Sequence, residues 1–220
     1  MNNRLKGRPS LRDKNFQIHD FSIPRHQRLQ QQHARCRKTF SCKNLCIWST
    51  NIRGLQSNYD SLRHVLEVSP DKPQLMFLCE TLIQPKSVGS GAFPISGFTC
   101  IRRDRSTGFG GGLAVYHHDD IAVSIIKSSR RLEIMWIHAR IHPHDLIFGL
   151  CYHPPSASSQ PFFDELDADL EILRGRYPRA KFQIIGDLNM HNRAWLPVNN
   201  KINEAGRLGE ALRHKTTFIS

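Results

Sequence analysis

Residues 182–189, FQIIGDLN, form a short apolar run that stops at a glycine and ends in an acid and an amide two residues apart. The run predicts a buried strand, along which side chains point alternately to opposite faces. Asp187 and Asn189 therefore project to the same side if the backbone stays extended, while Leu188 returns to the core. Gly186 permits a bend or a close approach to a ligand. Taken alone, the stretch fits a strand followed by an Asx turn better than it fits a functional site.

An acid beside an uncharged amide nevertheless suits phosphate-ester chemistry. A carboxylate can hold a metal ion or take a proton from water, whereas an amide donates to a phosphate oxygen without adding negative charge. A single Gly-Asp-x-Asn motif is a weak signal, so the interpretation depends on whether other strands also end in polar side chains.

Charge is distributed unevenly along the 220 residues. The formal net charge is +12, and residues 1–43 carry +9 of it, with eleven Lys and Arg against two Asp. These residues have few large apolar side chains and no clear periodicity, which predicts a disordered basic arm. Residues 44–220 are long enough for a single folded domain. The basic excess favours a polyanionic partner; the arm either follows phosphates electrostatically or is a solvated tail without a role.

The six cysteines include no Cys-x-x-Cys pair, and several lie in or beside apolar runs, which predicts reduced and mostly buried thiols. A zinc knuckle of His33, Cys36, Cys42 and Cys46 is the alternative, although its spacing matches no common metal site. The sequence has no transmembrane run and no apolar segment behind its first basic residues, so neither membrane insertion nor secretion is expected. We expect an intracellular, nuclear protein.

Hydrophobic patterns predict a mixed α/β fold. Apolar runs typical of strands occupy residues 45–48, 74–79, 97–102, 112–116, 121–126, 132–141, 146–152 and 182–185. Helices are expected around residues 58–66, 159–173 and 203–212. Strands that follow one another at this spacing indicate antiparallel pairs, unlike the strand-helix-strand opening.

Polar side chains stand at the ends of four of these strands. Asn51 ends the first, Glu80 follows the second, Tyr152 ends a third, and Asp187 and Asn189 end the last. Any one of them could be an ordinary loop residue. Their recurrence indicates a shared site.

The chain resembles the endonuclease/exonuclease/phosphatase superfamily, in particular the apurinic-type endonuclease domain of non-LTR retrotransposons. The stretches that carry the resemblance, in family order, are IWSTNIRGL at 47–55, LCET at 78–81, RRDR at 102–105 with GGGLAVY at 110–116, CYHPP at 151–155, GDLNMH at 186–191 with Trp195, and NEAGRL at 203–208. Together they are specific. The resemblance implies a four-layer α-β-β-α sandwich of two packed, mainly antiparallel sheets, incomplete at its C-terminus.

For the site, the resemblance implies Mg²⁺, with Mn²⁺ as the alternative, held by Glu80 and supported by Asn51. Asp187 would activate the attacking water, Asn189 would hold the phosphate, and Tyr152 would act on the phosphate or the leaving group. The residue types agree with these roles, because Mg²⁺ favours a carboxylate together with waters and substrate oxygens. The implied activity is Mg²⁺-dependent nicking of DNA, which in such elements primes reverse transcription.

Basic side chains near these positions are the candidate contacts to DNA. The resemblance places Arg53, Arg102, Arg105 and His191 there, with Arg103 beside them. An exposed basic loop without a role is the alternative for the three arginines between 102 and 105.

One departure from the family pattern concerns the catalytic histidine. In the family a Ser-Asp-His motif follows the Asn-Glu-Ala-Gly-Arg helix, and no Ser-Asp-His occurs in this sequence. We therefore expect a truncated domain with little or no activity. The pair His117-His118 does not occupy that motif and is expected to lie in a solvated turn. Two alternatives stay open: a non-catalytic nucleic-acid-binding remnant, and another phosphoesterase of the superfamily that acts on lipids or nucleotides.

Overall fold

The computed structural model describes residues 16–20, 45–84, 88–89, 91–105, 110–141, 144–191, 203–212 and 216–219. Its elements, in chain order, are β1 (Phe16–Asp20), β2 (Leu45–Asn51), α1 (Leu55–Val68), β3 (Leu75–Cys79), β4 (Phe98–Arg103), β5 (Leu113–His118), β6 (Ala122–Ser128), β7 (Glu133–Ile141), β8 (His144–Tyr152), α2 (Ser159–Arg176), β9 (Lys181–Asp187), α3 (Glu204–Leu212) and β10 (Thr217–Ile219).

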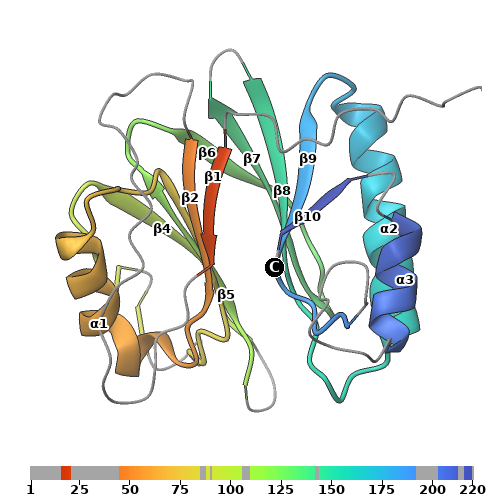
Figure 1. Ribbon diagram of the computed structural model, residues 1–220, viewed down its shortest axis with the longest axis horizontal. Coiled ribbons are helices and arrows are strands. Elements are labelled where there is room, and N and C mark those ends of the chain that lie inside the picture. Colours follow the sequence, from red (N-terminus) through yellow and green to blue (C-terminus); the bar gives the residue numbers. More distant parts are fainter. Residues whose placement is uncertain are drawn as a thin grey trace, which may run out of the picture.

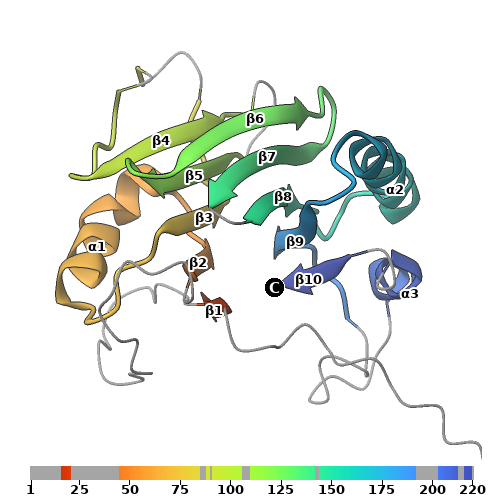
Figure 2. The same ribbon diagram turned by 90° about the horizontal axis from the view of Figure 1, so that it is seen from above.

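Two five-stranded sheets lie face to face, with α1 outside one sheet and α2 and α3 outside the other (Figure 1). The first sheet has the order β1-β2-β3-β5-β4 and the second has the order β10-β9-β8-β7-β6. Strands β1 and β10 form the edges on one side of the sandwich, and β4 and β6 form those on the other (Figure 2). The predicted four-layer α-β-β-α sandwich is confirmed.

Each sheet combines both directions of pairing. In the first sheet β1-β2 and β2-β3 are parallel, while β3-β5 and β5-β4 are antiparallel. The second sheet repeats this pattern, with β10-β9 and β9-β8 parallel and β8-β7 and β7-β6 antiparallel. The sheets are therefore evenly mixed, whereas the sequence resemblance implied mainly antiparallel pairing.

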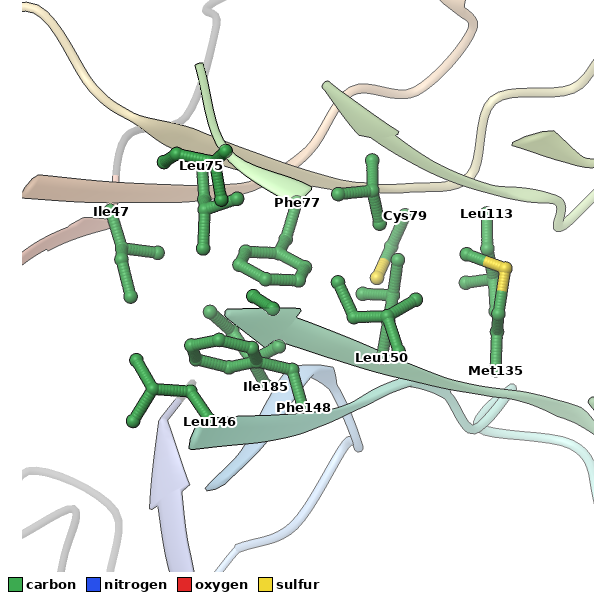
Figure 3. Close-up of a cluster of buried hydrophobic side chains, with 14 of the residues drawn as sticks. Ile47, Leu75, Phe77, Cys79, Leu113, Met135, Leu146, Phe148, Leu150 and Ile185 are labelled. Carbon is green, nitrogen blue, oxygen red and sulfur yellow. The ribbon is translucent and has the colours of Figure 1, made fainter. Parts of the chain in front are cut away.

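The facing sides of the two sheets are joined by a dry apolar layer. Phe77 on β3 packs against Phe148 on β8 with ring centroids 5.0 Å apart, and both side chains are fully buried. Figure 3 shows side chains of the two sheets pointing toward one another, among them Ile47, Leu75 and Leu150. A fully buried Leu, Ile or Phe side chain stabilises a fold by roughly 1.5–3 kcal/mol. This layer therefore fixes one sheet against the other and holds their strand ends in a defined relation.

The helices complete two outer clusters. Apolar residues at helical spacing on α1, Leu55, Leu62 and Leu66, are buried in one cluster with Trp48 of β2. On α2 the buried set of Phe162, Phe163, Leu166, Leu170 and Leu173 lies in a cluster with Trp136 of β7. The three predicted helices are thus confirmed, and both tryptophans are buried. Among the described residues, no helix is long and apolar enough to cross a membrane.

Two segments differ locally from the predicted structure. The prediction of a solvated turn for His117-His118 is wrong: both residues belong to β5, and His117 is buried because it pairs with Leu75 on one side and Thr99 on the other. Residues 16–20, inside the predicted basic arm, form strand β1 beside β2. The remaining residues of that arm, which include His33, Cys36 and Cys42, lie outside the described residues, and so does Trp195.

Two buried thiols predict how stability depends on pH. Burial raises the pKa of Cys79 and of Cys151 well above the usual range. Above the unfolded-state pKa of about 8.5, these thiols ionise in the unfolded chain but stay neutral in the folded protein. Their contribution to stability is therefore complete below this pH and is lost as pH rises above it. We expect the unfolding free energy, measured by urea titration, to fall above pH 9 by roughly 1.4 kcal/mol per pH unit for each thiol. A Cys79→Ala/Cys151→Ala variant should show a shallower fall, and an unchanged slope would contradict the argument.

Candidate active site

Strand register brings the predicted site residues to one rim of the sandwich. In the second sheet, Tyr152 on β8 lies opposite Asp187 on β9 and opposite Glu133 on β7. In the first sheet, Asn51 on β2 lies opposite Cys79, the last residue of β3. Because these residues stand where their strands meet the loops of one rim, side chains from both sheets can converge there.

The amide of Asn51 joins the two sheets at this rim. Its Nδ2 donates to Glu80 Oε1 at 2.8 Å and to Asp187 Oδ2 at 3.1 Å. The two carboxylate oxygens are therefore at most 5.9 Å apart, the sum of these two distances. Its Oδ1 accepts from the backbone N–H of Arg53 at 3.2 Å. The structure thus brings Asn51, Glu80 and Asp187 together, as the strand ends predicted.

Glu80 occupies a left-handed backbone conformation, with φ 54. This conformation costs a residue with a Cβ about 1–2 kcal/mol and persists only where neighbouring contacts impose it. The neighbouring contacts are backbone bonds on both sides: Gly54 N–H donates to Glu80 O at 2.8 Å, and Leu82 N–H donates to Gly111 O at 2.9 Å. The turn before α1 and the glycine turn before β5 together hold the segment that carries Glu80.

Tyr152 approaches the same carboxylate from the second sheet. Burial raises the pKa of Tyr152 well above its usual range, and a hydrogen bond to the Glu80 side chain raises it further. The hydroxyl therefore stays protonated near neutral pH. It can orient Glu80 and donate to an oxygen of a bound ligand.

Asn189 is held by its neighbours through its amide donor. It has φ 47, its backbone N–H donates to Asp187 Oδ1 at 3.1 Å, and its Nδ2 donates to His153 O at 2.9 Å. Its carbonyl accepts from Asn203 Nδ2. The predicted alternation with Asp187 required an extended backbone, which the left-handed turn replaces. Asn189 thus fixes the position of Asp187 by its backbone and ties β9 to the loop after β8.

Asn203 is a structural residue at this rim that sequence reasoning did not single out for the site. Its Oδ1 accepts from Gly206 N–H at 2.8 Å, which caps α3, and from His191 N–H at 2.9 Å. His191, a predicted DNA contact, is therefore half-buried and anchored by its backbone to the start of α3. An Asn side chain usually caps a helix by accepting from a backbone N–H three residues later, and this pattern was the sequence signal that could have identified Asn203.

The arginines predicted to contact DNA divide into two groups. Arg53 is exposed beside Asn51 and stays a candidate. Arg102 forms an ion pair with Asp104 at 3.1 Å, with only 8% of its side chain exposed. Arg105 forms an ion pair with Glu133 at 3.1 Å. Both guanidinium groups are thus paired with acids of the protein, and the Arg105 side chain is still 29% exposed.

Glu133 is the acid at the site that sequence reasoning missed. Its side chain is 4% exposed, and its Oε1 accepts from Gly112 N–H at 2.8 Å as well as from Arg105. A Cβ built on Gly111 would lie 2.3 Å from the same oxygen, so the glycine turn approaches as closely as it does because it lacks side chains. Glu133 fixes the turn that holds Leu82, and through it the segment of Glu80.

Removing this carboxylate is expected to destabilise the protein. In Glu133→Ala the Gly112 N–H and Arg105 lose their acceptor, and breaking a buried ion pair from one side costs about 3 kcal/mol. Glu133→Gln keeps one acceptor oxygen and should lose less. Urea unfolding would measure both. Glu67→Ala, which removes an exposed acid 3.9 Å from Arg63, is the control and should cost less than about 1 kcal/mol. Equal losses in the two Ala variants would contradict this role.

The donor set at the rim fits a hard divalent cation. Glu80 and Asp187 provide carboxylate oxygens, and Asn51 provides an amide between them. Among the described residues, no group of three or more His, Cys, Asp and Glu could hold a metal ion alone. Mg²⁺ does not require such a group, because it is usually bound through one or two carboxylates together with waters and substrate phosphates. The thiol of Cys79, which precedes Glu80, is buried and donates to Cys151 O.

A cavity of about 390 Å³ lies away from this rim, at the opposite end of the first sheet. It is lined by Gln74 before β3 and His118 at the end of β5, with Leu66, Ile95 and Phe98 among its apolar walls. Its size does not make it the functional site, because the carboxylates and amides that converge are all at the other end of β3.

Comparison with known proteins agrees with this architecture. No protein-family model and no curated protein matches the sequence. Solved structures that share the fold include a 3′ phosphatase, NExo, from Neisseria, bound to a product DNA hairpin (16% identity, TM-score 0.52, 77% of this chain and 70% of that chain); the AP endonuclease LMAP from Leishmania major (16%, 0.53, 67% and 56%); and the endonuclease domain of TRAS1, a telomere-specific non-LTR retrotransposon (11%, 0.52, 77% and 69%). The predicted resemblance is confirmed at the level of the fold.

Proposed function

We propose that this chain, which has the fold of the endonuclease/exonuclease/phosphatase superfamily, is a Mg²⁺-dependent endonuclease domain of retrotransposon origin that nicks DNA. The observation that carries the proposal is the convergence of Glu80 and Asp187 on the amide of Asn51 at one rim of the sandwich. The named neighbours with this fold include an AP endonuclease, a retrotransposon endonuclease domain and a phosphatase bound to DNA. A DNA substrate also implies a nuclear location.

The residues divide the chemistry between them. Glu80 and Asp187 would hold Mg²⁺ (or Mn²⁺), which when bound supplies positive charge next to the phosphate. Asp187 would also take a proton from the attacking water, whose oxygen bonds to phosphorus as the P–O bond to the leaving sugar oxygen breaks and that oxygen takes a proton from solvent. Asn51 keeps the two carboxylates close together, because its Nδ2 donates a hydrogen bond to each of them. The neutral hydroxyl of Tyr152 donates to the oxygens on which charge develops.

His153, which follows Tyr152, is engaged in packing. The ring of His153 is buried against Phe162, with centroids 4.9 Å apart, and neither ring nitrogen has a hydrogen-bond partner among the described residues. His153 therefore contributes packing and backbone bonds at this site.

A nicking assay on supercoiled plasmid tests the proposal. We expect conversion to the open circle with Mg²⁺ or Mn²⁺ and none with EDTA. A substrate panel that includes phospholipid and nucleotide phosphates separates DNA cleavage from another phosphoesterase activity. If folded protein converts no plasmid at any metal concentration, the endonuclease proposal is overturned.

The second candidate is a nucleic-acid-binding chain without catalysis. The observation that favours it is the charge distribution, with +9 of the net +12 in residues 1–43. Salt-dependent DNA binding that is lost on deleting residues 1–40 and unaffected by Asp187→Asn would support this reading over the endonuclease.

A further inference from the structure

We infer that the turn between β6 and β7, residues 129–132, is a contact surface for the phosphates of duplex DNA beside the cleavage site. This turn, called here the arginine turn, carries Arg130 and Arg131. The inference rests on the proposed function and adds to it the surface by which the duplex is held.

The arginine turn stands at the rim of the candidate site. Arg131 precedes Glu133 by two residues, Glu133 lies opposite Tyr152, and Tyr152 lies opposite Asp187. Neighbouring strands are about 4.8 Å apart, so the strand that the turn opens is roughly 10 Å from the strand of Asp187. A duplex whose backbone reached Asp187 would pass within range of long arginine side chains on this turn.

The turn has a fixed backbone. Ser129 Oγ accepts from Leu132 N–H at 2.9 Å, and Ser129 N–H donates to Ile134 O at 2.9 Å. From the first sheet, the guanidinium of Arg103 donates to Ser129 O at 2.9 Å and to Leu132 O at 2.8 Å. The two carbonyls that flank Arg130 and Arg131 are thus clamped by one side chain. A pre-ordered backbone lowers the entropy lost on binding.

The charges on the turn are available to a partner. Arg130 and Arg131 are both exposed, and neither forms an ion pair with a described residue. This differs from Arg102 and Arg105 nearby, whose guanidinium groups are paired with Asp104 and Glu133. Arginine matches the geometry of phosphate oxygens, and phosphate contacts position a protein on DNA without reading sequence.

A matched pair of double variants tests the surface. Arg130→Ser/Arg131→Ser removes both charges at the rim. Arg176→Ser/Arg179→Ser removes two exposed charges at the end of α2 and the start of the connection to β9, at the opposite end of β9 from Asp187. Binding of each to a fluorescein-labelled 20-base-pair duplex is measured by anisotropy between 50 and 200 mM NaCl, in EDTA. Thermal unfolding of each variant verifies that it is folded.

We expect the rim variant to lose on the order of 10-fold to 100-fold in affinity at 50 mM salt, and its log–log salt slope to fall by about 1.8, the value for two phosphates. The opposite-end variant should keep the slope of the unaltered protein. Equal effects of the two double variants, or no effect of either, would overturn the arginine turn as a DNA contact. Neither result would contradict the proposal that the protein nicks DNA. Absence of DNA binding by the unaltered protein would overturn the proposed function as well.

Discussion

Replacing Glu80 by Gln is expected to abolish measurable Mn²⁺ binding and to slow plasmid nicking by on the order of 10²–10³-fold. The substitution keeps the shape of the side chain and removes one of the two carboxylates that converge on Asn51. A hard divalent cation depends on such oxygen charge, and a neutral amide oxygen replaces it poorly. Electron paramagnetic resonance of free Mn²⁺ measures binding directly, without reference to activity.

Glu171→Gln is the matched control for this experiment, because it removes an exposed acid on the outer face of α2. It should leave both Mn²⁺ binding and nicking unchanged. Undiminished Mn²⁺ binding in the Glu80 variant would show that the cation sits elsewhere, whether or not nicking persists.

Gly186→Ala is expected to be the most destabilising single substitution in the described core, with a loss of at least about 3 kcal/mol in the free energy of unfolding. Gly186 has φ 128, and a Cβ on it would lie 2.1 Å from the carbonyl oxygen of Cys151 on the neighbouring strand. Backbone cannot move aside as a flexible side chain can. The residue also precedes Asp187, so any local relief would displace that carboxylate.

Gly175→Ala provides the control, since nothing lies within 4 Å of a Cβ at that position in the last turn of α2. There the better helix propensity of alanine should raise stability by up to about 1 kcal/mol. Urea unfolding of the two variants measures the contrast. A loss below about 1 kcal/mol in Gly186→Ala would mean that the close strand contact is not rigid.

The sequence was sufficient to predict which strand ends form the candidate site. Asn51, Glu80 and Asp187 each follow a run of apolar residues whose burial fixes where the strand stops, so their shared rim follows from the pattern and the layered fold. Contacts that connect distant segments were not predictable in this way. Arg105 and Glu133 are 28 residues apart, and no local periodicity links them.

Local geometry accounts for the other differences. The expectation for Asn189 assumed an extended chain after Asp187, and the backbone instead turns to φ 47. The ladder to β4 continues through His117 and His118, and the ladder to β3 continues to His117, so strand pairing outweighs the polar character of the pair. Parallel pairing of β1 and β10 depends on segments distant from their partners, for which adjacency in the sequence gives no guide.

The left-handed backbone of Glu80 and Asn189 at the rim sets stability of the fold against binding of a cation. Glycine at position 80 or 189 would relieve about 1–2 kcal/mol of backbone cost at each site while deleting the polar group there. A library of variants selected only for heat tolerance should therefore accumulate glycine at these two positions and lose cation affinity in the same step. Co-selection for bound Mn²⁺ would keep the acid at position 80.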